Sequence, residues 1–172
     1  MKLLLIGHTE RYPVEQLQMQ LFPDEPSEFV TQRFSGDGTV SSLSRGKKYL
    51  TATAKVTRGE KTGFAARRIP LTQADVRMTR RILQQSYYLA ATKVLGTVPP
   101  WGALSGVRPT KLSTKCMLAG GSEKDAARLL EKTYFVTPER SRLCVDASKH
   151  TLEAAKLLEP GDLSVYIGIP FC

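Results

Sequence analysis

Hydrophobic residues near the start of the chain follow first a strand pattern and then a helix pattern. Residues 3–6 are apolar without interruption, which predicts a short buried strand over residues 2–7. Apolar residues then recur at helical spacing, so we expect a helix over residues 12–22, with Pro13 in its first turn. A segment with two prolines, residues 23–26, ends this helix.

From residue 28 the hydrophobic pattern changes to the period of two that is typical of strands. Residues 29–34 and residues 39–43 lie on either side of a Gly-Asp-Gly turn, which predicts a β-hairpin. Residues 49–57 alternate most regularly, and residues 64–69 follow as a further strand or an extended loop. A strand over residues 49–57 would have one buried and one exposed face. The buried face would contain Leu50, Ala52, Ala54 and Val56, and the exposed face Tyr49, Thr51, Thr53, Lys55 and Thr57.

The chain after residue 71 is predicted to be mainly helical. The longest helix begins at Thr72, which has capping-box spacing to Asp75, and it ends at Gly96. Residues 98–102, Val-Pro-Pro-Trp-Gly, cannot be helical throughout and are interpreted as a linker. Helical patterns resume at Thr110.

Two further helices are predicted before the end of the chain. Ser122 and Asp125 have the spacing to cap a helix that runs to about residue 135. Thr137 and Pro138 open the next helix, which ends at a Pro-Gly-Asp turn. The last ten residues, 163–172, are apolar and strand-like up to Pro170.

These elements together indicate an α+β protein. We expect a small antiparallel or mixed sheet with helices in the N-terminal half, followed by a helical second half. The expected units are an α+β domain over residues 1–97, a helical domain over residues 98–162 and a terminal strand over residues 163–172.

The composition is that of a globular protein without a membrane span. Of the 172 residues, 41% are hydrophobic, and the apolar run at the N-terminus is too short for a signal peptide or a membrane helix. The three cysteines, Cys116, Cys144 and Cys172, stand far apart, which favours a reducing compartment. We therefore expect a cytoplasmic protein.

The net charge of +9 is concentrated in the middle of the chain. Residues 29–72 contain 9 basic and 2 acidic side chains, and residues 73–115 contain 7 and 1. A basic surface attracts phosphate or carboxylate ligands, so a nucleic-acid-binding module is one hypothesis and an ordinary solvated surface is the other. Tyr49 is the one aromatic residue clearly placed on an exposed strand face, which is little for base stacking. The basic residues of the predicted sheet are Arg33, Lys47, Lys48, Lys55, Arg58, Lys61, Arg67 and Arg68.

Three stretches of the second half resemble one enzyme family. They are residues 100–112 (Pro-Trp-Gly-Ala-Leu-Ser-Gly-Val-Arg-Pro-Thr-Lys-Leu), residues 134–142 (Tyr-Phe-Val-Thr-Pro-Glu-Arg-Ser-Arg) and residues 166–172 (Tyr-Ile-Gly-Ile-Pro-Phe-Cys). They resemble the HemZ-like branch of the coproporphyrinogen-oxidase-like radical S-adenosylmethionine (SAM) enzymes. The first 96 residues carry no specific motif. Gly168 stands where the true oxygen-independent coproporphyrinogen oxidases usually have a histidine, which leaves open whether the full protein decarboxylates coproporphyrinogen.

The resemblance implies cofactors for which this chain would hold only part of the site. In the family, a cysteine at the place of Cys172 is the first of a CxxxCxxC trio whose thiolates bind a [4Fe-4S] cluster. Tyr166 matches a tyrosine near the bound SAM. Because only the first cysteine is present, we expect the cluster and SAM in the full-length parent and neither in this fragment. The alternatives are a terminal free thiol and a strand tyrosine that packs against a neighbour.

Arg108 and Lys111 form a possible site for an anion or for the substrate. They are three residues apart near a predicted helix start, where an arginine can bind a carboxylate or phosphate with two hydrogen bonds. Gly102 and Gly106 would allow a close backbone approach, and a porphyrinogen with four propionates, the substrate that the family implies, suits such a site. Alternatively, Trp101 and the glycines form a packed corner between domains, and Arg108 pairs with a local acid or carbonyl.

The sequence therefore favours an N-terminal accessory domain of a HemZ-type radical SAM oxidoreductase of haem or porphyrin biosynthesis. Its partners would be its own missing C-terminal radical SAM core, which the terminal strand would enter, and a tetrapyrrole substrate. The parent is expected to be an enzyme, whereas this fragment has no catalytic residue that we can name and is not expected to act alone. A basic nucleic-acid-binding module and a structural or dimerising domain are the alternatives. His8 and His150 stand too far from other ligands to suggest a zinc site.

Overall fold

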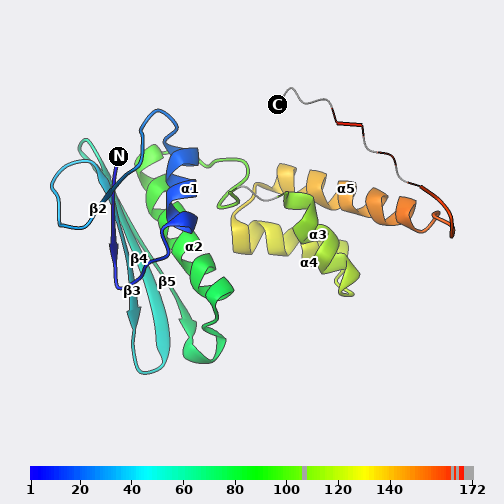
Figure 1. Cartoon of the computed structure of the whole chain (residues 1–172), viewed down its shortest axis with the longest axis horizontal. Helices are drawn as coiled ribbons and strands as arrows, with labels where there is room; N and C mark the ends of the chain where they lie inside the picture. Colours follow the sequence, from blue (N-terminus) through cyan, green and yellow to red (C-terminus); the bar gives the residue numbers. More distant parts are fainter. Residues whose placement is uncertain (106–107, 164, 166, 169–172) are drawn as a thin grey trace.

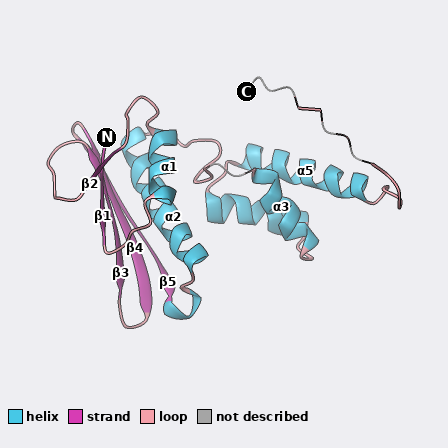
Figure 2. Ribbon diagram, viewed as in Figure 1, coloured by secondary structure: helices cyan, strands magenta, loops and turns pink. Residues whose placement is uncertain are grey.

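The computed structural model describes residues 1–105, 108–163, 165 and 167–168, which form an α/β unit and a helical unit (Figure 1). The α+β class predicted from the sequence is confirmed. In the first unit, two helices cover one face of a mixed sheet (Figure 2). Its elements are β1 (Lys2–Ile6), α1 (Tyr12–Leu21), β2 (Glu28–Val30), β3 (Gly38–Arg45), β4 (Tyr49–Arg58), β5 (Lys61–Pro70), the 3-10 turn η1 (Leu71–Gln73) and α2 (Val76–Leu95). The second unit consists of α3 (Pro109–Leu118), α4 (Glu123–Arg128), the π-helical turn η2 (Leu129–Thr133) and α5 (Pro138–Ala155).

The order of the strands, β2-β1-β3-β4-β5, corrects the predicted hairpin. β2 and β3 do not pair with each other; they lie on opposite sides of β1 and both run parallel to it. The register places Leu4 between Val30 and Val40. Leu3 and Leu4 are buried, and a strand that buries its apolar run needs a neighbour on each side. Residues 31–37 therefore connect two strands across β1 and are not a tight turn.

The alternation over residues 49–57 is confirmed as the packing pattern of β4. Its predicted buried face, Leu50 to Val56, packs in one apolar cluster with α1 and α2. Leu83 and Tyr87 of α2 are the largest contributions from that helix, and both side chains are fully buried. β5 pairs with β4 in antiparallel register, so residues 64–69 form a strand and not an extended loop.

The caps of α2 agree with the prediction at one end and differ at the other. Asp75 is the N-cap, because its Oδ1 accepts a hydrogen bond from the backbone N–H of Met78 at 2.6 Å. Thr72, the predicted cap, lies in the 3-10 turn η1. At the other end, Gly96 closes the helix as predicted, with a left-handed φ of 71°.

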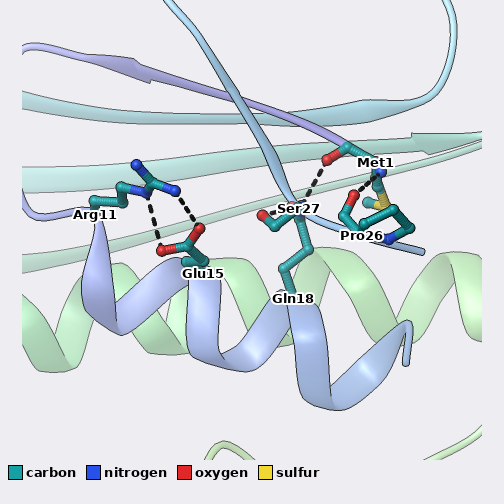
Figure 3. A network of polar contacts seen from close by, with 6 residues as sticks. All are labelled: Met1, Arg11, Glu15, Gln18, Pro26 and Ser27. Carbon is teal, nitrogen blue, oxygen red and sulfur yellow. Dashed lines mark hydrogen bonds and ion pairs between the residues drawn. The ribbon is translucent and has the colours of Figure 1, made fainter. Parts of the chain in front are cut away.

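A buried glutamine ties α1 to the two parallel strands at the edge of the sheet. The Nε2 of Gln18 donates to the carbonyl oxygen of Met1 and to the Oγ of Ser27, each at 2.9 Å (Figure 3). Met1 precedes β1 and Ser27 precedes β2. One fully buried side chain therefore fixes the start of both strands against the helix.

The helical unit begins and ends its helices close to the predicted positions. Ser122 and Asp125 form the predicted capping box. The helix predicted to run to about residue 135 changes at Leu129 into the π-helical turn η2. Buried hydroxyl groups join α3 to α5, where the Oγ atoms of Ser113 and Ser148 are 2.6 Å apart.

The described part of the terminal segment does not form the predicted strand. Leu163, Val165 and Ile167 are 90%, 82% and 83% exposed and belong to no sheet. A strand needs neighbours to satisfy its backbone groups, and no described residue pairs with this segment. In the part of the chain that the structure describes, no helix has the length and apolar character needed to cross a membrane.

His8 gives the stability of the α/β unit a pH dependence. It follows β1, and its Nε2 lies 3.1 Å from the Oγ of Ser41. Burial is the largest effect and lowers the pKa of His8 from its ordinary value of 6.5, although Ser41 and Glu10 act in the opposite direction. The unfolded chain therefore takes up this proton at a higher pH than the folded chain does. We expect the contribution of His8 to stability to be complete above about pH 6.5 and to be lost as the pH falls below it.

This expectation can be tested by urea denaturation at a series of pH values. His8→Gln should reduce the loss of unfolding free energy between neutral and mildly acidic pH. An unchanged profile in His8→Gln would contradict the assignment.

Candidate anion-binding groove

A groove of about 490 Å³ lies between the first turns of α2 and the helical unit. Every charged side chain that lines it is basic: Arg77, Arg80 and Arg81 come from α2, and Lys115 comes from α3. The remaining lining residues are Val76, Gln84, Ala103, Leu104, Ser105, Leu112 and Tyr134. Four cations and a partly apolar wall therefore surround this groove.

The spacing of residues in α2 explains why these side chains gather. Positions 77, 80, 81 and 84 follow helical periodicity, so they share one face of α2. A neighbouring face of the helix carries Leu83 and Tyr87 into the core of the α/β unit. The polar stripe of an amphipathic helix is thereby directed at the helical unit instead of at open solvent.

Direct contacts hold the two walls of the groove together. The guanidinium of Arg81 donates to the Oη of Tyr134 at 3.2 Å and lies over the ring of the same residue. Gln85 donates from its Nε2 to the carbonyl oxygen of Thr133 at 2.7 Å. The ring of Phe135 stacks on Tyr88 with centroids 5.3 Å apart. These contacts join α2 to the turn that follows η2.

The basic side chains of the groove differ in how they are already engaged. Arg80 donates to the carboxylate of Glu10 at 2.6 Å, which offsets its charge. Arg77 and Lys115 form no ion pair with any residue described by the structure, and both are exposed. These two cations are therefore the ones available to an incoming carboxylate or phosphate.

A larger depression between α4 and α5, of about 720 Å³, lacks this charge bias. It is lined by three basic and three acidic side chains, so opposite charges offset each other. These charged residues are Lys124, Arg140, Arg142, Glu123, Glu139 and Asp146.

The two predicted anion-binding residues lie outside the groove. Arg108 is the N-cap of α3, and its side chain is exposed and makes no cap hydrogen bond. Lys111 lines a separate shallow depression of about 330 Å³, together with Lys115, which borders both. The lysine of α3 that lines the groove is therefore Lys115, which lies one turn after the predicted Lys111. The sequence did contain a signal for the groove, because Arg77, Arg80 and Arg81 recur at helical spacing in the long predicted helix.

Trp101 and Gly102 lie in a closely packed corner that joins the two units. This is the packed corner that the alternative interpretation of the Trp-Gly motif expected. Gly102 has a φ of 60°, and a Cβ at this position would overlap the backbone of Tyr134 and Phe135. The backbone N–H of Ala103 donates to the carbonyl oxygen of Tyr134 at 2.7 Å. Arg140 lies over the ring of Trp101. The predicted close backbone approach is confirmed at Gly102, and Gly106 lies outside the described residues.

The described residues do not supply a ligand set for an iron-sulfur cluster. Cys144 is buried on α5, where burial raises the pKa of its thiol, and Cys116 is half-buried on α3. No three His, Cys, Asp or Glu side chains gather into a metal-binding group among the residues that could be described. The predicted cluster ligand Cys172 and the predicted SAM contact Tyr166 lie outside that part of the chain.

Comparison with known proteins gives one significant relative by sequence. The chain is 26% identical over 166 residues to the "Oxygen-independent coproporphyrinogen-III oxidase-like protein HemZ" of Bacillus subtilis (strain 168). The match covers 92% of this chain and 31% of the relative, so the chain spans less than a third of the length of the protein that it resembles. No protein-family model matches the chain. Protein VC0702 of Vibrio cholerae is 12% identical, with 91% of this chain and 98% of that chain covered, but the TM-score of 0.29 is too low to carry an argument.

Proposed function

We propose that this chain is the N-terminal accessory part of a HemZ-like oxidoreductase of tetrapyrrole metabolism. The observation that carries the proposal is the match to HemZ, which extends over almost the whole chain but less than a third of the relative. We expect such coverage of the two sequences if this chain corresponds to an accessory region that precedes a separate catalytic core. Parts of both HemZ-like motifs meet at the corner between the two units, where the N–H of Ala103 donates to the carbonyl oxygen of Tyr134 at 2.7 Å and the N–H of Thr137 donates to that of Pro100 at 3.0 Å.

The catalytic chemistry in this proposal belongs to a radical SAM core outside the described residues. Cys172 would be the first thiolate ligand of a [4Fe-4S] cluster, and Tyr166 would lie near SAM. The cluster would supply the electron for reductive cleavage of SAM. The part described here would bind and orient the substrate and would take no part in the redox step.

We further propose that the groove binds carboxylates of the substrate. A coproporphyrinogen carries four propionates around an apolar macrocycle, and the groove combines cations with apolar wall residues. The guanidinium of Arg77 can bind one carboxylate with two parallel hydrogen bonds, and Lys115 contributes a second charge. Arg108 and Lys111, near the start of α3, would attract the same anions from the adjacent surface.

The accessory role is tested by reading and expressing the gene beyond Cys172. We expect cysteines four and seven positions further on. A protein extended through the region that follows them, purified without oxygen, should contain an iron-sulfur cluster and cleave SAM when reduced. A stop codon directly after Cys172 would remove the radical SAM proposal.

The groove is tested with coproporphyrin III, the stable oxidised form of the substrate that the resemblance implies. Binding to the chain should quench the fluorescence of Trp101, the single tryptophan, and saturate. Replacing both Arg77 and Lys115 with glutamine should weaken this binding about tenfold, or by about 1.4 kcal/mol, because two unpaired cations are lost.

The matched control removes the same charge from the depression between α4 and α5. Lys124→Gln with Arg142→Gln should leave the affinity for coproporphyrin III close to that of the wild type. Equal weakening in both double variants would show that net charge alone is responsible and would overturn the assignment of the groove.

A further inference from the structure

The sheet of the α/β unit has a second face that the helices do not cover (Figure 2). The register identifies the residues of this face on the two last strands, because paired residues in neighbouring strands point to the same side. Tyr49 lies opposite Pro70, Thr51 opposite Arg68, Lys55 opposite Phe64 and Thr57 opposite Thr62. Phe64, within β5, is 55% exposed, and Tyr49, at the start of β4, is 40% exposed. Such exposure is unusual for large side chains in long strands.

Each of the two exposed aromatic residues has a cation next to it. The guanidinium of Arg68 lies over the ring of Tyr49, 4.7 Å from its centroid. Lys55 is the cross-strand partner of Phe64, and both side chains are exposed. Tyr49 and Lys55 are six positions apart in β4, which places the two pairs about 20 Å apart along one strand. The side chains of Thr51 and Thr53 line the interval between them.

A hollow adjoins the pair of Lys55 and Phe64. It has a volume of about 220 Å³ and is lined by Phe34, Ser35, Gly36, Gly38, Val40, Lys55, Thr57 and Thr62. The ring of Phe34 lies over Gly38, at a place where a Cβ would collide with it. The Oγ1 atoms of Thr57 and Thr62, two of the lining residues, are 3.3 Å apart. The hollow therefore brings together an aromatic ring, a cation and hydroxyl groups.

We propose that this open face of β4 and β5 binds single-stranded RNA. Exposed aromatic rings at intervals along a flat sheet provide surfaces on which bases stack, and flanking Lys and Arg contact phosphates. The hydroxyl groups of Thr57 and Thr62 provide donors and acceptors suited to a ribose 2′-OH. Charge complementarity supports this ligand, because the charged side chains on this face of β4 and β5, Lys55 and Arg68, are both basic.

The distribution of apolar residues favours RNA over a protein partner. Phe64 and Tyr49 are separated by threonines and cations and do not form one continuous apolar patch. A stable protein interface has an apolar core depleted of charge, whereas here each ring stands beside a cation. The face also lies on a different part of the molecule from the groove, so the two sites can be varied independently.

The test is the binding of a fluorescently labelled single-stranded RNA of mixed sequence to the chain, followed by fluorescence anisotropy. Affinity should fall steeply as the salt concentration rises, because phosphate contacts release counterions. Phe64→Ala should weaken binding about tenfold through the loss of one stacking surface. Lys55→Gln should weaken binding and reduce its salt dependence. Both residues are exposed, so circular dichroism should show both variants folded.

Matched measurements separate this proposal from its competitors and from the proposed function. Arg77→Gln with Lys115→Gln, in the groove, should bind RNA as the wild type does, and Phe64→Ala should bind coproporphyrin III as the wild type does. The proposal is overturned by RNA binding that Phe64→Ala and Lys55→Gln leave unchanged, or by the absence of salt-sensitive binding. Equal affinity for DNA of the same sequence overturns the assignment to RNA. A dimer that Phe64→Ala dissociates would assign the face to a second copy of the chain.

Discussion

Gly102→Ala is expected to lower the free energy of unfolding by about 3 kcal/mol, the combined effect of a left-handed backbone and an overfilled contact. Gly102 has a φ of 60°, which a residue with a side chain adopts only at a cost. A Cβ would also overlap the carbonyl oxygen of Tyr134 and the backbone of Phe135. Neither neighbour can move away easily, because Ala103 donates a hydrogen bond to Tyr134 and the ring of Phe135 stacks on Tyr88.

Urea denaturation followed by the fluorescence of Trp101 would measure this effect next to the altered residue. Gly120→Ala is the matched control, since Gly120 has a φ of 88° but a Cβ there would meet nothing within 4 Å. The control should cost only the backbone part, about 1 kcal/mol. If Gly102→Ala lost no more stability than Gly120→Ala, close packing at the corner would be excluded as the reason for the glycine. Because this corner also forms one wall of the groove, Gly102→Ala should weaken coproporphyrin III binding as well.

Gly63→Ala is expected to destabilise the α/β unit by about 3 kcal/mol through overpacking alone. Gly63 is buried in β5, directly against α2. A Cβ there would overlap the carbonyl oxygen of Ala90 and lie 3.2 Å from the Cβ of Lys93. The strand can accept a methyl group only if α2 moves away from the sheet, and that movement would open contacts of Leu83 and Tyr87 with the core.

The loss is measured by thermal and urea unfolding followed by circular dichroism. Gly46→Ala, in the turn between β3 and β4, is the control, because its Cβ would lie 3.5 Å from the nearest atom, an ordinary contact distance. It should change stability by no more than about 0.5 kcal/mol. A small effect of Gly63→Ala, similar to that of Gly46→Ala, would mean that α2 packs less closely on β5 than the structure shows.

Local patterns in the sequence predicted most individual elements. The alternation of β4 identified its buried face, and the Ser122 and Asp125 spacing identified the capping box of α4. Gly96 marked the end of α2. These features depend on residues that are close in sequence, where side-chain periodicity and backbone caps act within a few positions. The same information misplaced the start of α2 by three residues, because Thr72 and Asp75 are both acceptable caps.

Strand pairing required the tertiary structure. Residues 29–34 and 39–43 satisfied the local rules of a hairpin, yet β1 lies between the strands that they contribute. Turn residues favour a hairpin only locally, whereas burial of Leu3 and Leu4 depends on neighbours from both sides. The described residues between 163 and 168 show the opposite. Their sequence is apolar and strand-like, but they have no neighbouring strand and are exposed.

For the candidate sites, too, some features follow from the sequence and others only from the tertiary structure. The sequence by itself determined the basic character of the middle of the chain, the Trp-Gly motif and the resemblance of the second half to HemZ-like proteins. Only the tertiary structure decided which cations meet: Arg77 and Lys115 share a groove, whereas Arg108 and Lys111 lie outside it. It also placed Phe64 beside Lys55 on the open face of the sheet. The physical reason is that charge and periodicity are properties of the chain, whereas a site depends on distances between residues far apart in sequence, and packing of the core sets those distances.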